Sequence, residues 1–309
     1  MLSYIIRRIF HAVLVVFAIS IIVFFSIRLT GDPVAVMFSA GEPTQEAIDQ
    51  LTEELGLDKP LYVQYGVFMK GLLTFDLGES FRSGIPVMTL ILERAWPTFV
   101  LALGGIFVAL LIAFPVGIIS AVKRDTFLDF GGRVFSLIGI SFPNFWLGFM
   151  LILIFAVNLQ WLPASGFEGF SYLILPSITL GLILSGVLAR LVRSSMLEVL
   201  NQQYIRTAKS KGISKWKVIL KHAFRNALLP TVTFIGLQFG ALLGGTVIVE
   251  QVFSWPGIGR LIIDAINQRD YPVVQGGIVF LALVMVVVNL LVDLSYSLID
   301  PRIKAGKGK

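Results

Sequence analysis

The sequence contains no cysteine, only two histidines and few charged residues. Without cysteine the chain forms no disulfide, has no thiol nucleophile and offers no thiolate ligand to zinc. Charged residues make up 14% and hydrophobic residues 56% of the 309 positions. An average soluble domain carries about 25% charge. A soluble enzyme is therefore disfavoured, and the mean hydropathy of +0.85 indicates a protein embedded in a bilayer.

Signatures of catalysis are also missing. His11 and His222 belong to no H-E-x-x-H pattern, and neither a G-x-S-x-G elbow nor a G-x-x-x-x-G-K-[ST] phosphate loop occurs. We therefore predict no catalytic residue, no metal site and no cofactor in this chain. If ATP drives its function, another subunit must bind the nucleotide.

Six long stretches of the sequence carry no charge at all. A helix that spans the bilayer needs roughly 20 apolar residues, and each stretch has at least 19. The third is longer than one span needs, and Pro163, Ser165 and Gly166 predict that its helix stops near Leu159. The sequence therefore predicts an all-α, multi-pass inner-membrane protein with six transmembrane helices, drawn from the stretches 9–27, 95–122, 134–167, 169–189, 226–249 and 271–292. The first run is longer than the apolar part of a typical secretory signal, which indicates an uncleaved anchor.

The distribution of basic residues predicts the orientation of the chain, because lysine and arginine favour cytoplasmic loops. With the N-terminus inside, the inner segments hold 18 of the 25 basic residues, while the outer segments hold 14 of the 19 acidic ones. We therefore expect both termini in the cytoplasm.

These boundaries divide the chain into successive regions. Residues 1–28 form the N-terminal end and first span, 29–94 an extracytoplasmic segment, 95–300 a five-span core, and 301–309 a cytoplasmic tail. Within 29–94, Thr44 is expected to cap a helix that Gly56 stops, and a second helix is expected over 61–72 after Pro60. This segment is either a solvated cap or a docking surface for an external partner.

The inner loop 194–225 holds seven basic residues and one acid. Gly212 is expected to stop one helix and Ser214 to cap the next, in which Trp216, Ile219, Leu220 and Ala223 form one apolar face. A basic amphipathic helix of this kind can lie on anionic lipid or contact a protein. Nucleic-acid binding is not expected, because membrane topology accounts for the charges and no series of stacking aromatics accompanies them.

A few groups inside the spans call for an interpretation. Gly236, Gly240 and Gly244 repeat every four residues, which predicts close helix packing or, alternatively, part of a translocation path. Asp293 is the carboxylate placed well inside an apolar run. We expect it to form an ion pair with Arg190 or Arg193; a proton relay is the alternative role.

Several blocks of sequence resemble one known family. The stretch from Tyr204 to Gly212, followed by 225–230 (Arg-Asn-Ala-Leu-Leu-Pro), resembles the EAA signature of permeases from binding-protein-dependent ABC importers. Further blocks resemble the peptide and nickel subfamily of these permeases, and the resemblance covers essentially the whole chain; they lie at 31–33, 55–60, 250–259, 269–272 and 300–301. Arg206-Thr207-Ala208 stands in place of Glu-Ala-Ala, so an acidic contact at position 206 does not carry over.

The resemblance implies a type I importer fold and a set of partners. These are a homologous second permease, two cytoplasmic ATPases that carry ATP and Mg²⁺, an extracytoplasmic solute-binding protein facing 29–94 and 251–275, and membrane lipid. It also implies that the inner loop couples the permease to an ATPase through Tyr204, Arg206, Thr207, Ala208, Lys209, Lys211 and Gly212.

The resulting prediction is a transport subunit for peptides such as dipeptides, oligopeptides or glutathione, without enzymatic activity of its own. A permease for a nickel chelate or another small solute is the alternative within the family. An ion-driven carrier using Asp293, an intramembrane hydrolase and a membrane scaffold are the rivals outside it. Repeats and broken helices typical of ion-driven carriers are not evident, and a lone carboxylate supplies no hydrolase site.

Overall fold

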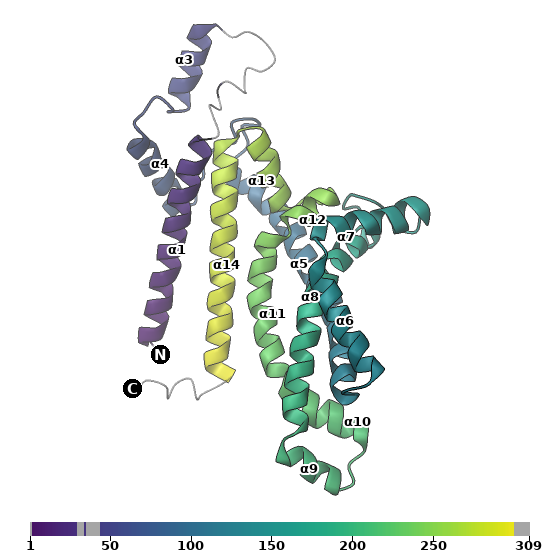
Figure 1. Ribbon diagram of the computed structural model, residues 1–309. Helices are drawn as coiled ribbons and strands as arrows, with labels where there is room; N and C mark the ends of the chain where they lie inside the picture. The colour runs from purple at the N-terminus through teal and green to yellow at the C-terminus, as the bar shows by residue number, and fades with distance from the viewer. Residues whose placement is uncertain (1, 30–33, 35–43, 300–309) are drawn as a thin grey trace. The chain divides into compact units, whose positions relative to one another are not determined.

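The chain is all-α in the computed structural model, which describes residues 2–29, 34 and 44–299 (Figure 1). Side chains are described at these positions except 2–5, 140, 245 and 293–299. In this part of the chain the one β pairing is an isolated bridge between Glu79 and Pro86. The helices are α1 (Leu2–Arg28), α3 (Gln45–Glu54), α4 (Leu61–Thr74), α5 (Val87–Val122), α6 (Phe127–Ser141), α7 (Asn144–Leu151), the π-helical η1 (Ile152–Asn158), α8 (Phe170–Leu200), α9 (Gln203–Ser210), α10 (Lys215–Lys217), the π-helical η2 (Val218–Phe224), α11 (Arg225–Gly245), α12 (Val247–Val252), α13 (Ile258–Asn267) and α14 (Tyr271–Ile299).

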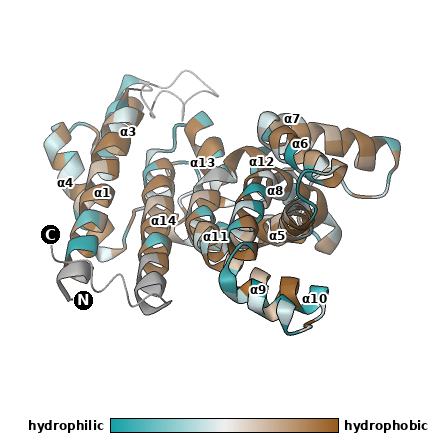
Figure 2. Ribbon diagram, turned by 60° about the horizontal axis from the view of Figure 1, so that its bottom comes forward, coloured by the Kyte–Doolittle hydropathy of each residue, from teal (hydrophilic) through white to brown (hydrophobic). Residues whose placement is uncertain are grey.

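Five helical runs in the described residues are long and apolar enough to cross a bilayer. They are Ile6–Arg28, Val87–Val122, Phe170–Leu200, Lys215–Gly244 and Tyr271–Val292. Figure 2 shows hydrophobic residues dominating long helices such as α5 and α14. The predicted six spans are obtained when α6 and the α7–η1 run are counted together as one bent span.

The third span departs from the prediction of a single helix. It ends at Asn158, close to the expected Leu159, but it is broken at Phe142–Pro143, where the two helices meet at 104°. Proline has no N–H to donate and disfavours helical backbone in the residue before it. Phe142 is accordingly extended, with φ −90° and ψ 133°. The spans were predicted from stretches without charged residues. Proline is uncharged, so that criterion could not reveal this break.

Helix ends and membrane boundaries do not coincide. The helix α5 begins at Val87 and includes the charged Glu93 and Arg94, while α8 continues past Arg190 to Leu200. Charged residues mark where the chain leaves the apolar layer of the membrane. A helix ends where its terminal backbone groups are hydrogen-bonded by partners outside the helix.

The chain divides into two compact units, the first of which contains 1–98 and 256–286. Its two predicted short helices are confirmed. Thr44 precedes α3 and its hydroxyl accepts a hydrogen bond from the Ala47 N–H, and Gly56 ends the helix with φ +63°. The helix α4 follows Pro60, as expected.

A buried carboxylate ties the loop before α5 to the start of α14 in this unit. Asp270 is 4% exposed and accepts hydrogen bonds from the Ser80 hydroxyl and the Phe81 N–H. An apolar cluster of Ile27, Val87, Ile91, Ile262 and Val274 packs alongside. The buried acid is thus satisfied by local donors, as a buried polar group requires.

The second unit, 99–255 with 287–309, is organised around α8. Helices α6, α7, α11 and α12 all contact α8. In its most apolar window 61% of the residues are buried, against 22% for Lys215–Gly244. The long central helix therefore forms the core of this unit.

Glycines allow α5 to approach α8 closely. A Cβ atom placed on Gly181 would lie 2.6 Å from Val108 Cβ and 2.8 Å from the Gly105 carbonyl oxygen. Both distances are shorter than van der Waals contact, so a side chain there would force the two helices apart.

We predict that Gly181→Val destabilises the protein by about 1–3 kcal/mol, because overpacked sites force backbone shifts. Gly131→Val is the matched control, since it makes the same change within a helix where a Cβ would have nothing within 4 Å. Thermal unfolding of the purified protein in detergent measures the difference. Equal melting temperatures for the two variants would contradict this account of the contact.

Candidate functional site

The inner loop of the sequence folds into the short helix α9, held between the end of α8 and the η2 segment. Its inward residues are Ile205, which is fully buried, and Ala208, which is 8% exposed. They pack in one apolar cluster with Val192 and Met196 of α8 and with Ile219 of η2. Two residues three apart lie on one face of a helix, so this spacing anchors α9 by one side only.

The other predicted coupling residues lie on the exposed side of this loop. Tyr204, Arg206, Thr207, Lys209 and Lys211 are all exposed, and so is Gly212. Ala208 differs from them, because it is buried and packs the helix onto the protein. The structure therefore presents a small basic surface made of six of the seven residues.

A Schellman motif ends α9 at Gly212. The Gly212 N–H donates to the Lys209 carbonyl at 3.0 Å, and the Ile213 N–H donates to the Ala208 carbonyl at 3.3 Å. Gly212 has φ +73°, the left-handed conformation that this motif requires. Ile213 packs against the apolar cluster under α9. The predicted helix stop is confirmed, and the turn fixes the direction in which the chain leaves the helix.

Tyr204 is held at the first turn of α9. The Asn226 side-chain amide donates to the Tyr204 hydroxyl at 2.9 Å and to the His222 carbonyl at 2.8 Å. The hydrogen bond joins the start of α9 to the start of α11. The start of α9 is therefore fastened to the start of the long helix that follows.

The predicted apolar face of the next helix is only partly correct. Ile219 and Ala223 are buried as expected, but Trp216 is 70% and Leu220 50% exposed, and Val218 is buried instead. The reason is the π-helical η2, whose i→i+5 hydrogen bonds shift the register that a regular α-helix would have. Ser214 precedes α10 as predicted, although its hydroxyl makes no capping hydrogen bond.

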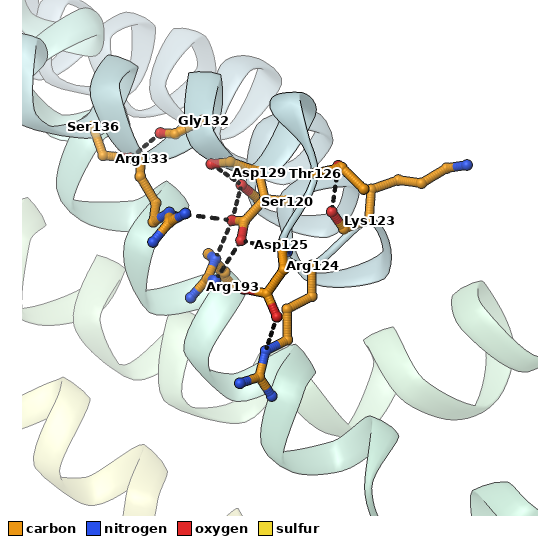
Figure 3. A network of polar contacts seen from close by, with 10 residues as sticks. All are labelled: Ser120, Lys123, Arg124, Asp125, Thr126, Asp129, Gly132, Arg133, Ser136 and Arg193. Atoms are coloured by element: carbon orange, nitrogen blue, oxygen red, sulfur yellow. Dashed lines mark hydrogen bonds and ion pairs between the residues drawn. The ribbon is translucent and has the colours of Figure 1, made fainter.

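An ion pair joins the buried Asp129 of α6 to the partly buried Arg193 of α8 (Figure 3). The Arg193 Nε lies 2.7 Å from Asp129 Oδ1, and its Nη2 lies 2.8 Å from Oδ2. The Asp129 side chain has no exposed surface. This two-point contact is the strong form of an arginine–carboxylate pair, because the two N–H groups each donate to a different carboxylate oxygen.

Further donors complete the shell of Asp129. The Ser120 hydroxyl of α5 donates to Oδ1 at 3.0 Å, and the Asp125 N–H donates to Oδ2 at 3.1 Å. Arg133 lies at 3.7 Å, with half of its side chain exposed. Figure 3 shows these groups converging on the carboxylate. They belong to α5, α6, α8 and the turn between α5 and α6. The clamp, as we name the Asp129–Arg193 pair, therefore holds α5, α6 and α8 together.

The sequence did not identify the clamp. It predicted that Arg190 or Arg193 pairs with Asp293, whereas Arg193 is bound by Asp129. The side chain of Asp293 lies outside the described residues, and its pairing stays a prediction. The available signal was an acid in the first turn of a helix, four residues before Arg133. That local pattern gives no indication of a partner 64 positions away.

The three glycines of α11 behave differently from one another. A Cβ on Gly236 would lie 2.7 Å from a Val292 methyl group of α14, which indicates close packing. Gly240 is buried, whereas a Cβ on Gly244 would have nothing within 4 Å. The described residues also contain no group of three histidine or acidic side chains placed to hold a metal ion.

Comparison with known proteins gives matches over almost the whole chain. A family model described as "Binding-protein-dependent transport system inner membrane component" matches residues 113–305, and the N-terminal model of the same kind of component matches 1–102. The chain is 43% identical to the dipeptide transport system permease protein DppB of Alkalihalophilus pseudofirmus, over 98% of this chain and all of that protein. It is 42% identical to the glutathione transport system permease protein GsiC of Escherichia coli K12, over 98% and 99% of the two chains.

Two solved structures share the fold. One, the methionine ABC transporter MetNI in inward-facing conformations, gives a TM-score of 0.52 at 18% identity, over 67% of this chain and 96% of that chain. The other, an amino acid ABC transporter crystallised with histidines, gives a TM-score of 0.50 at 15% identity, over 67% and 92%. At these identities the likeness concerns the fold alone.

We predict that Asp129→Asn lowers the free energy of unfolding by about 3 kcal/mol, because it leaves the Arg193 guanidinium without its counter-charge. Asp125→Asn is the matched control. Its carboxylate is 74% exposed and pairs with Arg124 at the surface, where such pairs contribute at most about 1 kcal/mol. Thermal unfolding in detergent separates the two. Equal shifts for both variants would show that the clamp contributes no more than a surface pair.

Proposed function

Since the chain belongs to the family of binding-protein-dependent transport system inner membrane components, we propose that it is the permease subunit of an ABC importer for short peptides. Its relatives DppB and GsiC are named for dipeptide and glutathione transport. The two are about equally similar to this chain, each over 98% of its length. Dipeptides and glutathione share a peptide bond with free ionised ends. That shared chemistry supports short peptides as the substrate class.

The proposed mechanism is mechanical. The sequence has no phosphate loop, so ATP and Mg²⁺ belong to two partner ATPases, and a homologous second permease completes the path. The excess of basic residues in the inner segments supports cytoplasmic termini and a cytoplasmic α9. An external solute-binding protein delivers the peptide to the opposite face.

The observation that carries this proposal is the construction of α9. It is exposed and basic on one side, and anchored to α8 and η2 on the other. The run Lys215–Gly244 begins after the turn at Gly212 and continues into a membrane span without a break. Closure of the ATPases against α9 would therefore move α11 as part of one rigid body, which is how shifts at an interface reach a distant site.

We predict that Gly212→Val uncouples ATP hydrolysis from uptake, while Gly212→Asn keeps most of the activity. Nothing lies within 4 Å of a Cβ at this position, so steric contact does not distinguish the two variants. They differ in tolerance of φ +73°, which asparagine adopts and a β-branched residue resists. In proteoliposomes with the partner subunits, uptake should fall about tenfold or more for valine and less than about twofold for asparagine. Unaltered uptake by Gly212→Val would remove the coupling role from α9.

We also predict that the assembled transporter with its binding protein hydrolyses ATP faster in the presence of dipeptides or glutathione than with free amino acids or a nickel chelate. Uptake of a radiolabelled dipeptide into proteoliposomes is the matching measurement. The control uses the same vesicles without the binding protein. Stimulation by free amino acids or by the nickel chelate alone would overturn the peptide assignment while leaving the coupling role intact.

A further inference from the structure

A cavity of about 220 Å³ opens beside the clamp, between α5, α6 and α8. Its wall contains three arginines and no carboxylate: Arg133 of α6, and Arg190 and Arg193 of α8. Arg193 is neutralised by Asp129, which lies behind the wall. We call this cavity the arginine pocket.

Two of the three arginines, Arg133 and Arg190, have N–H groups that can still bind an anion. Arg190 is exposed and makes no ion pair or hydrogen bond with any side chain that the structure describes. Arg133 lies 3.7 Å from Asp129, at the outer limit of an ion pair, and its side chain is 52% exposed. Both oxygens of Asp129 are already occupied by closer donors. The pocket is therefore electropositive, with guanidinium groups available to bind an incoming anion.

Apart from Ser120 and Ser136, the remainder of the pocket is apolar, and it faces an apolar surface. Val116, Leu137 and Ala189 line it with one residue from each of its three helices. On α6 nearby, Phe130 is 59% and Leu137 60% exposed. A surface of this kind on a membrane-spanning unit is solvated by lipid chains rather than by water.

The depth of the pocket agrees with a lipid headgroup. Arg190 is the first charged residue after the apolar stretch 169–189, and α5 ends at Val122, immediately before Lys123 and Arg124. Charges at the end of an apolar stretch lie at the boundary between hydrocarbon and water. A phospholipid in the adjoining leaflet would place its phosphate at this level and its chains along α6.

We propose that the arginine pocket binds the phosphate headgroup of an anionic phospholipid. Guanidinium groups present parallel N–H donors that match two phosphate oxygens, which is a geometry that favours arginine over lysine. Basic pockets between membrane helices are suited to such headgroups. Because the pocket shares Arg193 with the clamp, the bound lipid lies against the junction that supports the coupling region.

The test is native mass spectrometry of the intact transporter assembly, titrated with phosphatidylglycerol or with phosphatidylcholine of the same chains. We take about fivefold in affinity for each arginine that reaches the bound phosphate, the contribution of one basic residue close to an anionic headgroup. We expect R133Q/R190Q to weaken phosphatidylglycerol binding by about 30-fold and to leave phosphatidylcholine binding unchanged. The matched control K123Q/R124Q removes the same charge from the turn between α5 and α6, outside the pocket, and should change binding less than about twofold.

Several outcomes would overturn the proposal. They are equal losses in the two double variants, equal affinity for the two lipids, and displacement of the lipid by millimolar inorganic phosphate, which would assign the pocket to a free anion. D293N belongs in the same series, since a gain in lipid affinity for D293N together with no loss for R190Q would assign Arg190 to Asp293 and remove it from the lipid site. If R133Q/R190Q does not fold, R190Q alone carries the test, because Arg190 has no described partner to lose.

Discussion

The Asp129–Arg193 ion pair is the contact on which the second unit depends. A carboxylate without exposed surface is costly to bury unless its charge is matched and its lone pairs are filled. Here Arg193, Ser120 and the Asp125 N–H supply the charge and the hydrogen bonds. The pair fixes the turn between α5 and α6 against α8, and α8 in turn carries α6, α7, α11 and α12. Loss of this contact would free the end of α8 from which α9 begins.

In the proposed mechanism the chain converts movement at α9 into movement of its spans, which requires the coupling helix to be held firmly. The helix α9 is only eight residues long, too short to be stable by itself in water. Burial of Ile205 and Ala208, the Schellman turn at Gly212 and the hydrogen bond to Tyr204 supply the order that its length does not. The apolar cluster beneath it includes residues of α8, η2 and α11, so a force on α9 reaches all three.

The arginine pocket lies at the same junction of α5, α6 and α8, where a bound lipid would act on the clamp. A lipid bound there would share Arg193 with the clamp, so the composition of the membrane and the stability of the coupling region would be linked. Close packing through Gly181 and Gly105 on one side, and the break at Pro143 on the other, position the three helices that form the pocket. The same features thus build the unit and shape its site.

The sequence by itself determined the features that depend on composition or on neighbouring residues. The apolar stretches, the helices after Thr44 and Pro60, the stop at Gly212 and the basic inner loop all follow from local chemistry. The tertiary structure decided which charges meet, because many arginines are possible partners for one buried acid and only the packing of α6 on α8 selects Arg193. It also decided that Val218 is buried and Trp216 exposed. These positions follow from the π-helical hydrogen bonding of η2, which packs against α8 and α9. The hydrophobic pattern of the sequence does not indicate a π-helix.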